Sequence, residues 1–367
     1  MTTSVKLLAA SLHYPPELVL HTASSGRIKE LDELYLVIER DGCLAGFGEI
    51  RENVAYLTGL QPRAVRQGIA ALVRALDWSQ PHDEVAAQFL RVCTDTPAIS
   101  RALVDTALVD WAARARGIVV SELFGAPFRP EHTTNQSLFV SDDAHLRTMA
   151  KRYAARGFRK LKLRVGARSL REDCARLALL RELFGDGIEL AIDANGAWPL
   201  DDAIANLREM ARFDLAYAEQ PIAAGNWEAA LRLADASPVP IMLDESLISP
   251  DDIDCVIEAR GKLWAHLKII KLGGVTPTIS CARRLAAAEV PFMIGQMNEG
   301  AAATAAAFHC TITTNPAHAE LYGADGLIDD PVQGVSYADG TVRVERAPGL
   351  GVQIGTHNLE TLWEIRA

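Results

Sequence analysis

The chain lacks the features that mark membrane, disulfide-rich and nucleic-acid-binding proteins. No uninterrupted apolar run reaches about 18 residues, the length that a membrane-spanning helix requires. The six cysteines are scattered and form no CxxC pair, so we expect free, buried thiols rather than disulfides or a zinc site. The formal net charge of −10 argues against a nucleic-acid partner, because phosphate binding requires a basic surface.

Two further absences bear on location and on nucleotide binding. The first residues contain a short apolar stretch but no long hydrophobic segment with a clear cleavage site, so the cytoplasm is the expected location and no membrane partner is expected. The chain has neither a GxGxxG nor a GxxxxGKS/T motif, which disfavours an open nucleotide-binding sheet. With 367 residues and 49% hydrophobic content, it has ample material for a large domain with an accessory domain, or for two domains.

An antiparallel sheet followed by helices is predicted for the first third of the chain. The apolar-rich runs 33–39 and 43–49 flank Asp41 and Gly42, a pair that is typical of a hairpin turn. From 61 to 124, alanine and leucine recur at three- and four-residue intervals, which indicates helices.

After residue 130, short apolar strands alternate with amphipathic helices. Such alternation implies parallel strands joined by crossover helices, and the number of strands favours a closed barrel over an open sheet. The tail from about residue 335 is predicted to lie outside the barrel and to return to the N-terminal part. The expected strands are residues 137–140, 160–165, 189–193, 215–219, 241–244, 265–270, 291–295 and 317–322.

Carboxylates end three successive expected strands, at near-constant spacing: Asp193, Glu219 and Asp244. Because the C-terminal ends of parallel barrel strands open on one face, we expect these acids to converge there. Acids this close repel one another unless a cation lies among them, and oxygen ligands suit Mg²⁺, with Mn²⁺ as an acceptable substitute. A surface or helix-capping role would explain any one of the acids, whereas three in succession favour a metal site.

Basic residues alternate with apolar residues in two of the expected strands. Lys160, Lys162 and Arg164 share one face of their strand, as do His266 and Lys268 of another. The apolar face must pack against helices, so we expect the cations to point into the barrel, where the acids compensate their charge. A lysine there could remove the α-proton of a metal-bound carboxylate, while the metal and the remaining cations stabilise the enediolate.

The motifs around these positions resemble the enolase superfamily and, within it, the muconate lactonizing enzyme subgroup. The resemblance covers nearly the whole chain. It implies a (β/α)7β TIM-like barrel in residues 129–330, an N-terminal α+β capping domain in 1–128 and a C-terminal segment, 331–367, that completes the cap. The motifs are LKLRVG at 161–166, IDANGAW at 192–198, AEQPI at 218–222, LDES at 243–246, LKIIKLGG at 267–274 and GQMNEG at 295–300.

The resemblance also implies roles for individual residues. The three strand-end acids match the metal ligands of the family, and Lys268 matches its acid/base lysine. Lys162 matches the first lysine of a KxK motif, which contacts the substrate carboxylate. Glu299 lies where the subgroup has an acidic residue and is a candidate substrate contact. Asn195 and Gln220 are expected to orient the metal ligands.

One departure from the family pattern affects the expected reaction. The second lysine of KxK is Arg164 here, and an arginine stays protonated under nearly all conditions. Either the register shifts so that Lys160 and Lys162 form the working pair, or Lys268 is the only good base. The ungapped match of LKLRVG favours the second alternative. A single base favours elimination or cycloisomerisation over racemisation, with Arg164 as an electrostatic stabiliser.

Racemisation and epimerisation remain open alternatives, because the subgroup contains many racemases and epimerases. The predicted function is therefore isomerisation of a small acid through abstraction of the proton α to its carboxylate, by a racemase, epimerase or cycloisomerase. A one-base dehydratase or lyase and a metal-binding barrel without turnover are the alternatives. Assembly into a homo-oligomer is also expected.

Substrate identity is weakly encoded. The loop at 14–28 is expected to close over the substrate, with His21 and Ser24 available to a polar distal group, and Lys160 is a further candidate contact. Dipeptide epimerases of the subgroup carry Asp-x-Asp after the last strand to hold the substrate amine. Only half of that motif is matched here, by Asp325, which lowers the expectation of a dipeptide substrate.

Overall fold

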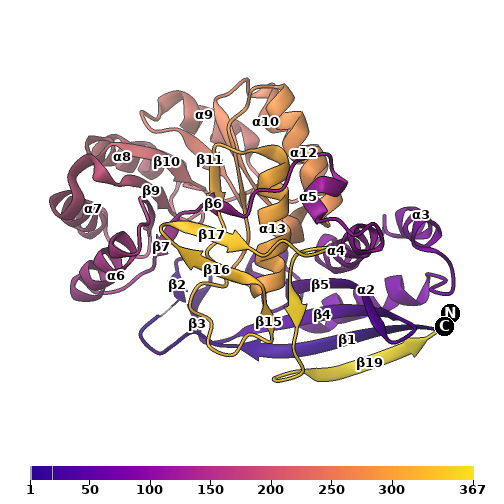
Figure 1. Ribbon diagram of the computed structural model, residues 1–367. Coiled ribbons are helices and arrows are strands. Elements are labelled where there is room, and N and C mark those ends of the chain that lie inside the picture. Colours follow the sequence, from indigo (N-terminus) through magenta and orange to yellow (C-terminus); the bar gives the residue numbers. More distant parts are fainter. Residues whose placement is uncertain (1, 19) are drawn as a thin grey trace.

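The computed structural model describes residues 2–18 and 20–367, and its central feature is a parallel sheet curved into a nearly closed barrel (Figure 1). The strands follow one another around the sheet in chain order. At the seam, the Asn135 amide donates to the Ala319 carbonyl at 3.1 Å. The strands are β7 (Gln136–Leu138), β8 (Lys160–Arg164), β9 (Glu189–Asp193), β10 (Leu215–Glu219), β11 (Ile241–Leu243), β12 (Leu263–Lys268), β13 (Phe292–Gly295) and β14 (His318–Glu320).

Helices connect each barrel strand to the next and cover the outside of the barrel (Figure 1). They pack against outward-facing apolar residues such as Leu161 and Leu163, which are fully buried. The predicted (β/α)7β barrel is therefore confirmed. The helices are α6 (Asp143–Ala155), α7 (Leu170–Phe184), α8 (Leu200–Met210), α9 (Trp227–Ala236), α10 (Pro250–Glu258), α11 (Ile269–Leu272), α12 (Val275–Ala287) and α13 (Ala301–Thr314).

The sixth barrel strand differs from its predicted limits of 265–270. Strand β12 begins two residues earlier and ends at Lys268, and the short helix α11 follows directly. The apolar pair Ile269 and Ile270 fits a buried strand or a buried helical turn equally well, so its pattern could not decide between them. As a result, Lys268 is the last residue of its strand and lies at the mouth of the barrel.

An apolar layer fills the barrel below this mouth. Ala191, Tyr217, Met242 and Met293 form a buried cluster inside it. The first three each precede one of the predicted metal ligands by two residues in the chain. Because side chains two residues apart share a face of a strand, the acids lie one layer above the cluster, at the C-terminal end of the barrel.

The capping part contains a four-stranded antiparallel sheet in the order β19-β1-β4-β5. The predicted hairpin joins β4 to β5, and Asp41 and Gly42 both have the positive φ that its turn requires. The C-terminal strand β19 lies beside β1, so the tail does return to the N-terminal sheet (Figure 1). The elements are β1 (Thr3–Leu12), β4 (Leu31–Arg40), β5 (Cys43–Arg51), β19 (Glu360–Arg366), α1 (Ala55–Thr58), α2 (Pro62–Arg74), α3 (His82–Val92), α4 (Ala98–Ala115) and α5 (Val120–Leu123).

Only the end of the tail joins the cap sheet. Strands β16 (Val335–Ala338) and β17 (Thr341–Val344) form a small sheet with β6 (Glu131–Thr133), while β15 (Val332–Gln333) pairs with β18 (Gln353–Ile354). The segment boundaries 1–128, 129–330 and 331–367 stay predictions.

Two expectations from composition can be compared with the structure. Over the described ranges, no helix has both the length and the hydropathy to cross a membrane. All six cysteines are free, as predicted, but only Cys174, Cys281 and Cys310 are buried. The expectation of burial is wrong for Cys43, which is exposed, and for Cys93 and Cys255, which are partly buried.

A hairpin of the cap reaches over the barrel mouth. It consists of β2 (Leu20–Thr22) and β3 (Gly26–Ile28). Before it, the Tyr14 hydroxyl donates to the Gly323 carbonyl and accepts a hydrogen bond from Asn298 Nδ2 at 3.0 Å. These bonds tie the segment that leads into the hairpin to loops after β13 and β14.

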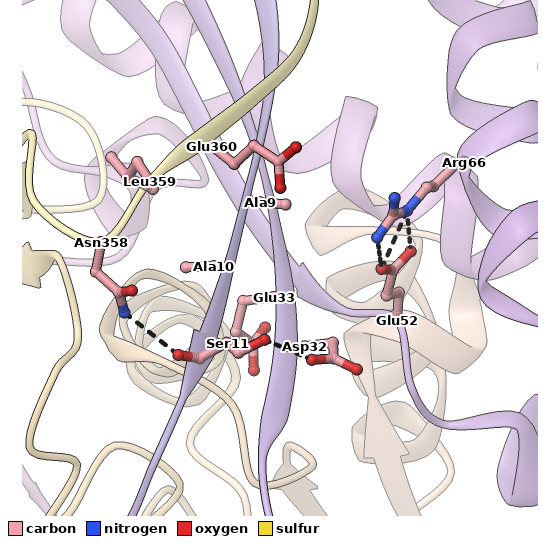
Figure 2. Close-up of a pocket in the computed structure, with 10 residues that line it drawn as sticks. All are labelled: Ala9, Ala10, Ser11, Asp32, Glu33, Glu52, Arg66, Asn358, Leu359 and Glu360. Carbon is pink, nitrogen blue, oxygen red and sulfur yellow. Dashed lines mark hydrogen bonds and ion pairs between the residues drawn. The ribbon is translucent and has the colours of Figure 1, made fainter.

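A buried acid lies between the cap sheet and the barrel. Glu33 on β4 is fully buried, and neither of its carboxylate oxygens has a partner in the part of the chain that the structure describes (Figure 2). Burial raises the pKa of Glu33 well above its usual range, and the carboxylates of Glu49, Glu299 and Asp330 add to this effect while Arg51 opposes it. Ionised Glu33 would therefore be a buried charge that Arg51 compensates only in part.

We expect Glu33→Gln to raise the melting temperature, and to do so more at pH 8 than at pH 5. The folded pKa of Glu33 exceeds the unfolded value, so the stability that Glu33 contributes is present below the unfolded pKa and is lost as the pH rises through the folded pKa. Between the unfolded and the folded pKa of Glu33, the free energy of unfolding that the Gln variant gains over the original protein grows by up to about 1.4 kcal/mol per pH unit. Thermal melts across this pH range provide the measurement, with the exposed Glu17→Gln as control. An increase that does not depend on pH would contradict the expectation.

Candidate active site

A small cavity of about 40 Å³ lies at the barrel mouth, between the strand ends and the cap. Charged side chains line its barrel side, among them Arg164, Asp244, Lys268 and Glu320. A larger hollow of about 520 Å³ lies on the cap, and none of the predicted site residues lines it (Figure 2). The cap side of the mouth cavity is formed by Thr22, Ser24, Ile28, Tyr56 and Leu57.

The structure brings two of the three predicted metal ligands together with a histidine. Asp193 and Glu219 end β9 and β10, Asp244 directly follows β11, and all three are buried. One oxygen each of Glu219 and Asp244 and one ring nitrogen of His266 lie within 4.8 Å of one another. Asp193 lies outside this group, and its Oδ2 is held by Arg164.

Two lysines hold Asp244. Lys268 Nζ lies 2.6 Å from Asp244 Oδ2, and Lys271 binds the other carboxylate oxygen and the backbone carbonyl. Burial opposes the charged form of Lys268, but the neighbouring carboxylates, with Asp244 the strongest among them, together outweigh burial and raise the pKa of Lys268 above its usual value. Burial likewise opposes ionisation of Asp244, yet Lys268 and Lys271 keep the pKa of Asp244 well below its usual range. Lys268 is thus a charged lysine, and its pKa depends on its contact with the Asp244 carboxylate.

Lys162 lies beneath the cavity rather than in its wall. Its Nζ is 2.7 Å from Glu219 Oε2 and 3.8 Å from Asp193 Oδ2, and it also pairs with Glu320 on β14. Asn135 Nδ2 donates to Glu320 at 3.0 Å. As expected, the lysine points into the barrel and its partners are acids of the protein. The predicted contact of Lys162 with a substrate carboxylate has no support from its position, because Lys162 does not line the cavity.

Arg164 is fixed in place by three contacts. Its guanidinium donates to Asp193 and, at 3.3 Å, to Asn195 Oδ1, and it lies 5.8 Å from the ring centre of Phe139. Burial opposes its charge, but the surrounding acidic groups, with Asp193 the strongest among them, together outweigh burial and raise the pKa of Arg164 well above its usual value. Arg164 is therefore a cation at the mouth and cannot accept a proton there.

The two residues expected to orient the metal ligands do contact them. The backbone N–H of Asn195 donates to Asp193 Oδ1 at 2.8 Å, and its side-chain Nδ2 donates to Glu245 Oε1 at 3.1 Å. Gln220 Oε1 accepts the Asp244 amide at 3.0 Å. Asn195 and Gln220 both have a positive φ, of 46° and 36°, a backbone strain that proteins maintain most often at functional sites.

Two predicted substrate contacts are wrong in position. Lys160 lies at the opposite end of β8, where its Nζ is 3.4 Å from Glu189 Oε2. The alternation of β8 indicated the face of Lys160 but not its depth in the barrel. Both oxygens of Asp325 bind Arg156 at 2.8 Å, and one also accepts from Gln136 at 2.7 Å, so this acid holds the loop after β14 instead of facing the cavity.

Of the remaining predicted substrate contacts, one lines the cavity and two do not. Ser24 lines the cavity, and its contact with a substrate stays a prediction. His21 pairs with Arg27 in the hairpin and does not line the cavity. Glu299 is buried beside the mouth, where its Oε2 accepts the Met297 amide at 2.9 Å. For Glu299 the prediction of a substrate contact has no support from its position.

Sequence reasoning missed several lining residues. Glu320 ends β14 as Asp193 and Glu219 end β9 and β10, so the strand-end rule could have found it. Glu245 is adjacent to Asp244 and could also have been found. No sequence signal marks the apolar and aromatic residues, because they lie in loops and in the cap without a pattern; they are Ile28, Tyr56, Leu57, Phe139, Met297 and Tyr322.

Comparison with known proteins agrees with this arrangement. Residues 145–357 match the family model of enolase C-terminal domain-like proteins. The chain is 29% identical over 343 residues to muconate cycloisomerase 1-2 of Acinetobacter lwoffii, covering 89% of this chain and 88% of that protein.

Solved structures show the same architecture. Muconate lactonizing enzyme from Pseudomonas fluorescens, complexed with muconolactone, has a TM-score of 0.88 and 26% identity, over 95% of both chains. A dipeptide epimerase from Cytophaga hutchinsonii, complexed with Mg and the dipeptide D-Ala-L-Val, has a TM-score of 0.89 over 100% of this chain and 99% of that one; at 22% identity it supports the fold alone. The chain belongs to the enolase C-terminal domain-like family and, within the enolase superfamily, to the muconate lactonizing enzyme subgroup.

Proposed function

We propose that this protein abstracts the proton α to the carboxylate of a small acid and thereby isomerises it, with Mg²⁺ as cofactor and Lys268 as general base. The observation that carries the proposal is the position of Lys268. It ends β12, lines the mouth cavity and contacts Asp244, one of the acids that would hold the metal. The relative named muconate cycloisomerase and the structure of a muconate lactonizing enzyme support the reaction class.

The residues at the mouth fit a hard divalent cation. All predicted ligands are carboxylates, which Mg²⁺ prefers and Mn²⁺ accepts. Glu245 Oε2 is buried and has no partner within the described ranges. Acidic groups outnumber basic ones in and directly under the cavity. The acidic residues are Asp193, Glu219, Asp244, Glu245 and Glu320, and the basic residues are Lys162, Arg164, Lys268 and Lys271.

The side chains would divide the work as follows. Bound Mg²⁺ would polarise the substrate carboxylate and so acidify the α-proton. Lys268 would act as the base: with Asp244 serving as a metal ligand, the carboxylate that stabilises the charged lysine would be shared, and Lys268 could release its proton and accept the α-proton of the substrate. Arg164 contributes a fixed positive charge at the mouth. Lys162 holds Glu219 and Glu320 from below.

A one-base elimination is the second candidate. The fixed Arg164 favours one-base reactions, either cycloisomerisation or elimination, over racemisation. Inversion requires a second group that accepts or returns a proton on the other face of the substrate. Arg164 occupies the matching strand position but stays charged and bound to Asp193.

We expect Arg164→Lys to supply that second group and to introduce exchange with loss of stereochemistry. The lysine would keep the positive charge near Asp193 but could release its proton. Chiral analysis of substrate recovered from D₂O measures this change, with Arg156→Lys as a control remote from the mouth. Exchange that still retains configuration would contradict the expectation.

The experiment that tests the proposed function is a deuterium-exchange screen. The protein is incubated with Mg²⁺ in D₂O and pooled N-acyl amino acids, dipeptides, hydroxyprolines, betaines, sugar acids and muconates. Mass spectrometry should detect a gain of one mass unit from exchange, or loss of water from elimination, and EDTA should abolish both. Silence across the pools with Mg²⁺ bound would favour a barrel without turnover. Light scattering would test the predicted homo-oligomer.

A further inference from the structure

His266 contacts Glu219 from inside the barrel. It lies on β12, two residues before Lys268, and is fully buried. Its Nδ1 is 2.9 Å from Glu219 Oε1, while Lys162 Nζ is 2.7 Å from Glu219 Oε2. The carboxylate is therefore held on both oxygens, by side chains from β8 on one side and β12 on the other.

The orientation of the ring is set by its surroundings. A carboxylate can only accept a hydrogen bond, so Nδ1 carries the proton that is donated to Glu219. Nε2 has no hydrogen-bond partner in the described chain. It lies against Gly295, where an added Cβ would stand 2.1 Å away. Glycine at this position leaves the space that the imidazole occupies.

This contact determines where Glu219 faces. Lys162 also pairs with Glu320, so a Glu219 carboxylate held by Lys162 alone could turn toward that side of the barrel. The bond from His266 holds Oε1 toward β12. One oxygen each of Glu219 and Asp244 and one ring nitrogen of His266 converge there within 4.8 Å.

We propose that His266 is a positioning residue, which fixes Glu219 beside Asp244 so that the two carboxylates can share a divalent cation. The inference rests on the proposed function, because it presumes a metal at these acids. It assigns His266 no contact with the cation. Partners that orient metal ligands in this way typically change metal affinity by about 10- to 100-fold when they are removed.

Two substitutions at this position separate the contact from the bulk of the ring. His266→Leu removes the donor, and we expect it to weaken Mg²⁺ and Mn²⁺ binding by about 10- to 100-fold in titration calorimetry of the metal-free protein. In His266→Asn the side-chain amide takes the place of Nδ1, so affinity should stay within about threefold of the original. His318→Asn is the matched control: His318 also faces the barrel interior, but stacks on Trp264 at the other end, and its loss should leave metal affinity unchanged.

The outcomes distinguish the inference from the proposed function. Unchanged affinity in His266→Leu, or an equal loss in Leu and Asn variants, would overturn the inference. Electron spin-echo spectra of the Mn²⁺-loaded protein should lack the nitrogen coupling of a directly bound imidazole; its presence would also overturn it, since His266 would then be a ligand. If His266→Leu does not fold, Gly295→Ala should produce the same loss of affinity by displacing the ring. Failure of the unchanged protein to bind either cation would instead overturn the proposed metal site.

Discussion

Replacing Lys268 with methionine is expected to abolish α-proton exchange while the barrel stays folded. Loss of a general base typically costs about 10²- to 10⁴-fold in rate, and here no second lysine lines the described cavity. Methionine fills a similar volume, and Asp244 keeps Lys271 as its counter-ion, so the change leaves no isolated buried charge. The rate of deuterium incorporation with Mg²⁺ and any substrate found in the screen provides the measurement.

Two controls give this result its meaning. Lys262→Met removes an exposed lysine near the other end of β12, paired only with Asp235 among the described residues, and should leave exchange unchanged. Mg²⁺ titration of Lys268→Met should show that the metal still binds. If exchange survives in the variant, the base lies elsewhere, and Lys162 becomes the leading candidate despite its contacts with Glu219 and Glu320.

Replacing Asp244 with asparagine is expected to weaken Mg²⁺ binding by at least about 100-fold, more than the loss of a residue that only orients a ligand. The amide keeps a ligand oxygen but lacks the negative charge that the cation requires. The change also removes the shared counter-ion of Lys268 and Lys271. Because the Asp244 carboxylate raises the pKa of Lys268, its removal should lower that pKa.

Titration calorimetry of the variant with Mg²⁺ measures the effect directly. Asp202→Asn, an exposed acid in the first turn of α8, is the control for loss of a negative charge without loss of a ligand. An unchanged Mg²⁺ affinity would remove Asp244 from the metal site, and with it the explanation for the position of Lys268.

Much of this architecture follows from local sequence patterns. Strands and helices alternate after residue 130 with their own periodicities, so the barrel could be predicted before any contact was known. The acids at positions 193, 219 and 244 were found because a strand end defines the face of the barrel on which a residue lies. The alternation of basic and apolar residues in β8 placed Lys162 and Arg164 inside the barrel, because residues two apart share one face of a strand. The limits of β12 were less certain, because a short apolar run has no period of its own.

Contacts between side chains across the barrel could not be predicted from the sequence. The sequence by itself determined the fold class, the strand-end acids and the replacement of a lysine by Arg164, because each of these is a property of one strand or one position. Only the tertiary structure decided that His266 holds Glu219, that Lys162 lies below the cavity, and that Arg156 rather than a substrate binds Asp325. Such pairs join residues far apart in the chain, and which side chains meet depends on the tilt and stagger of neighbouring strands, which spacing along the sequence does not specify.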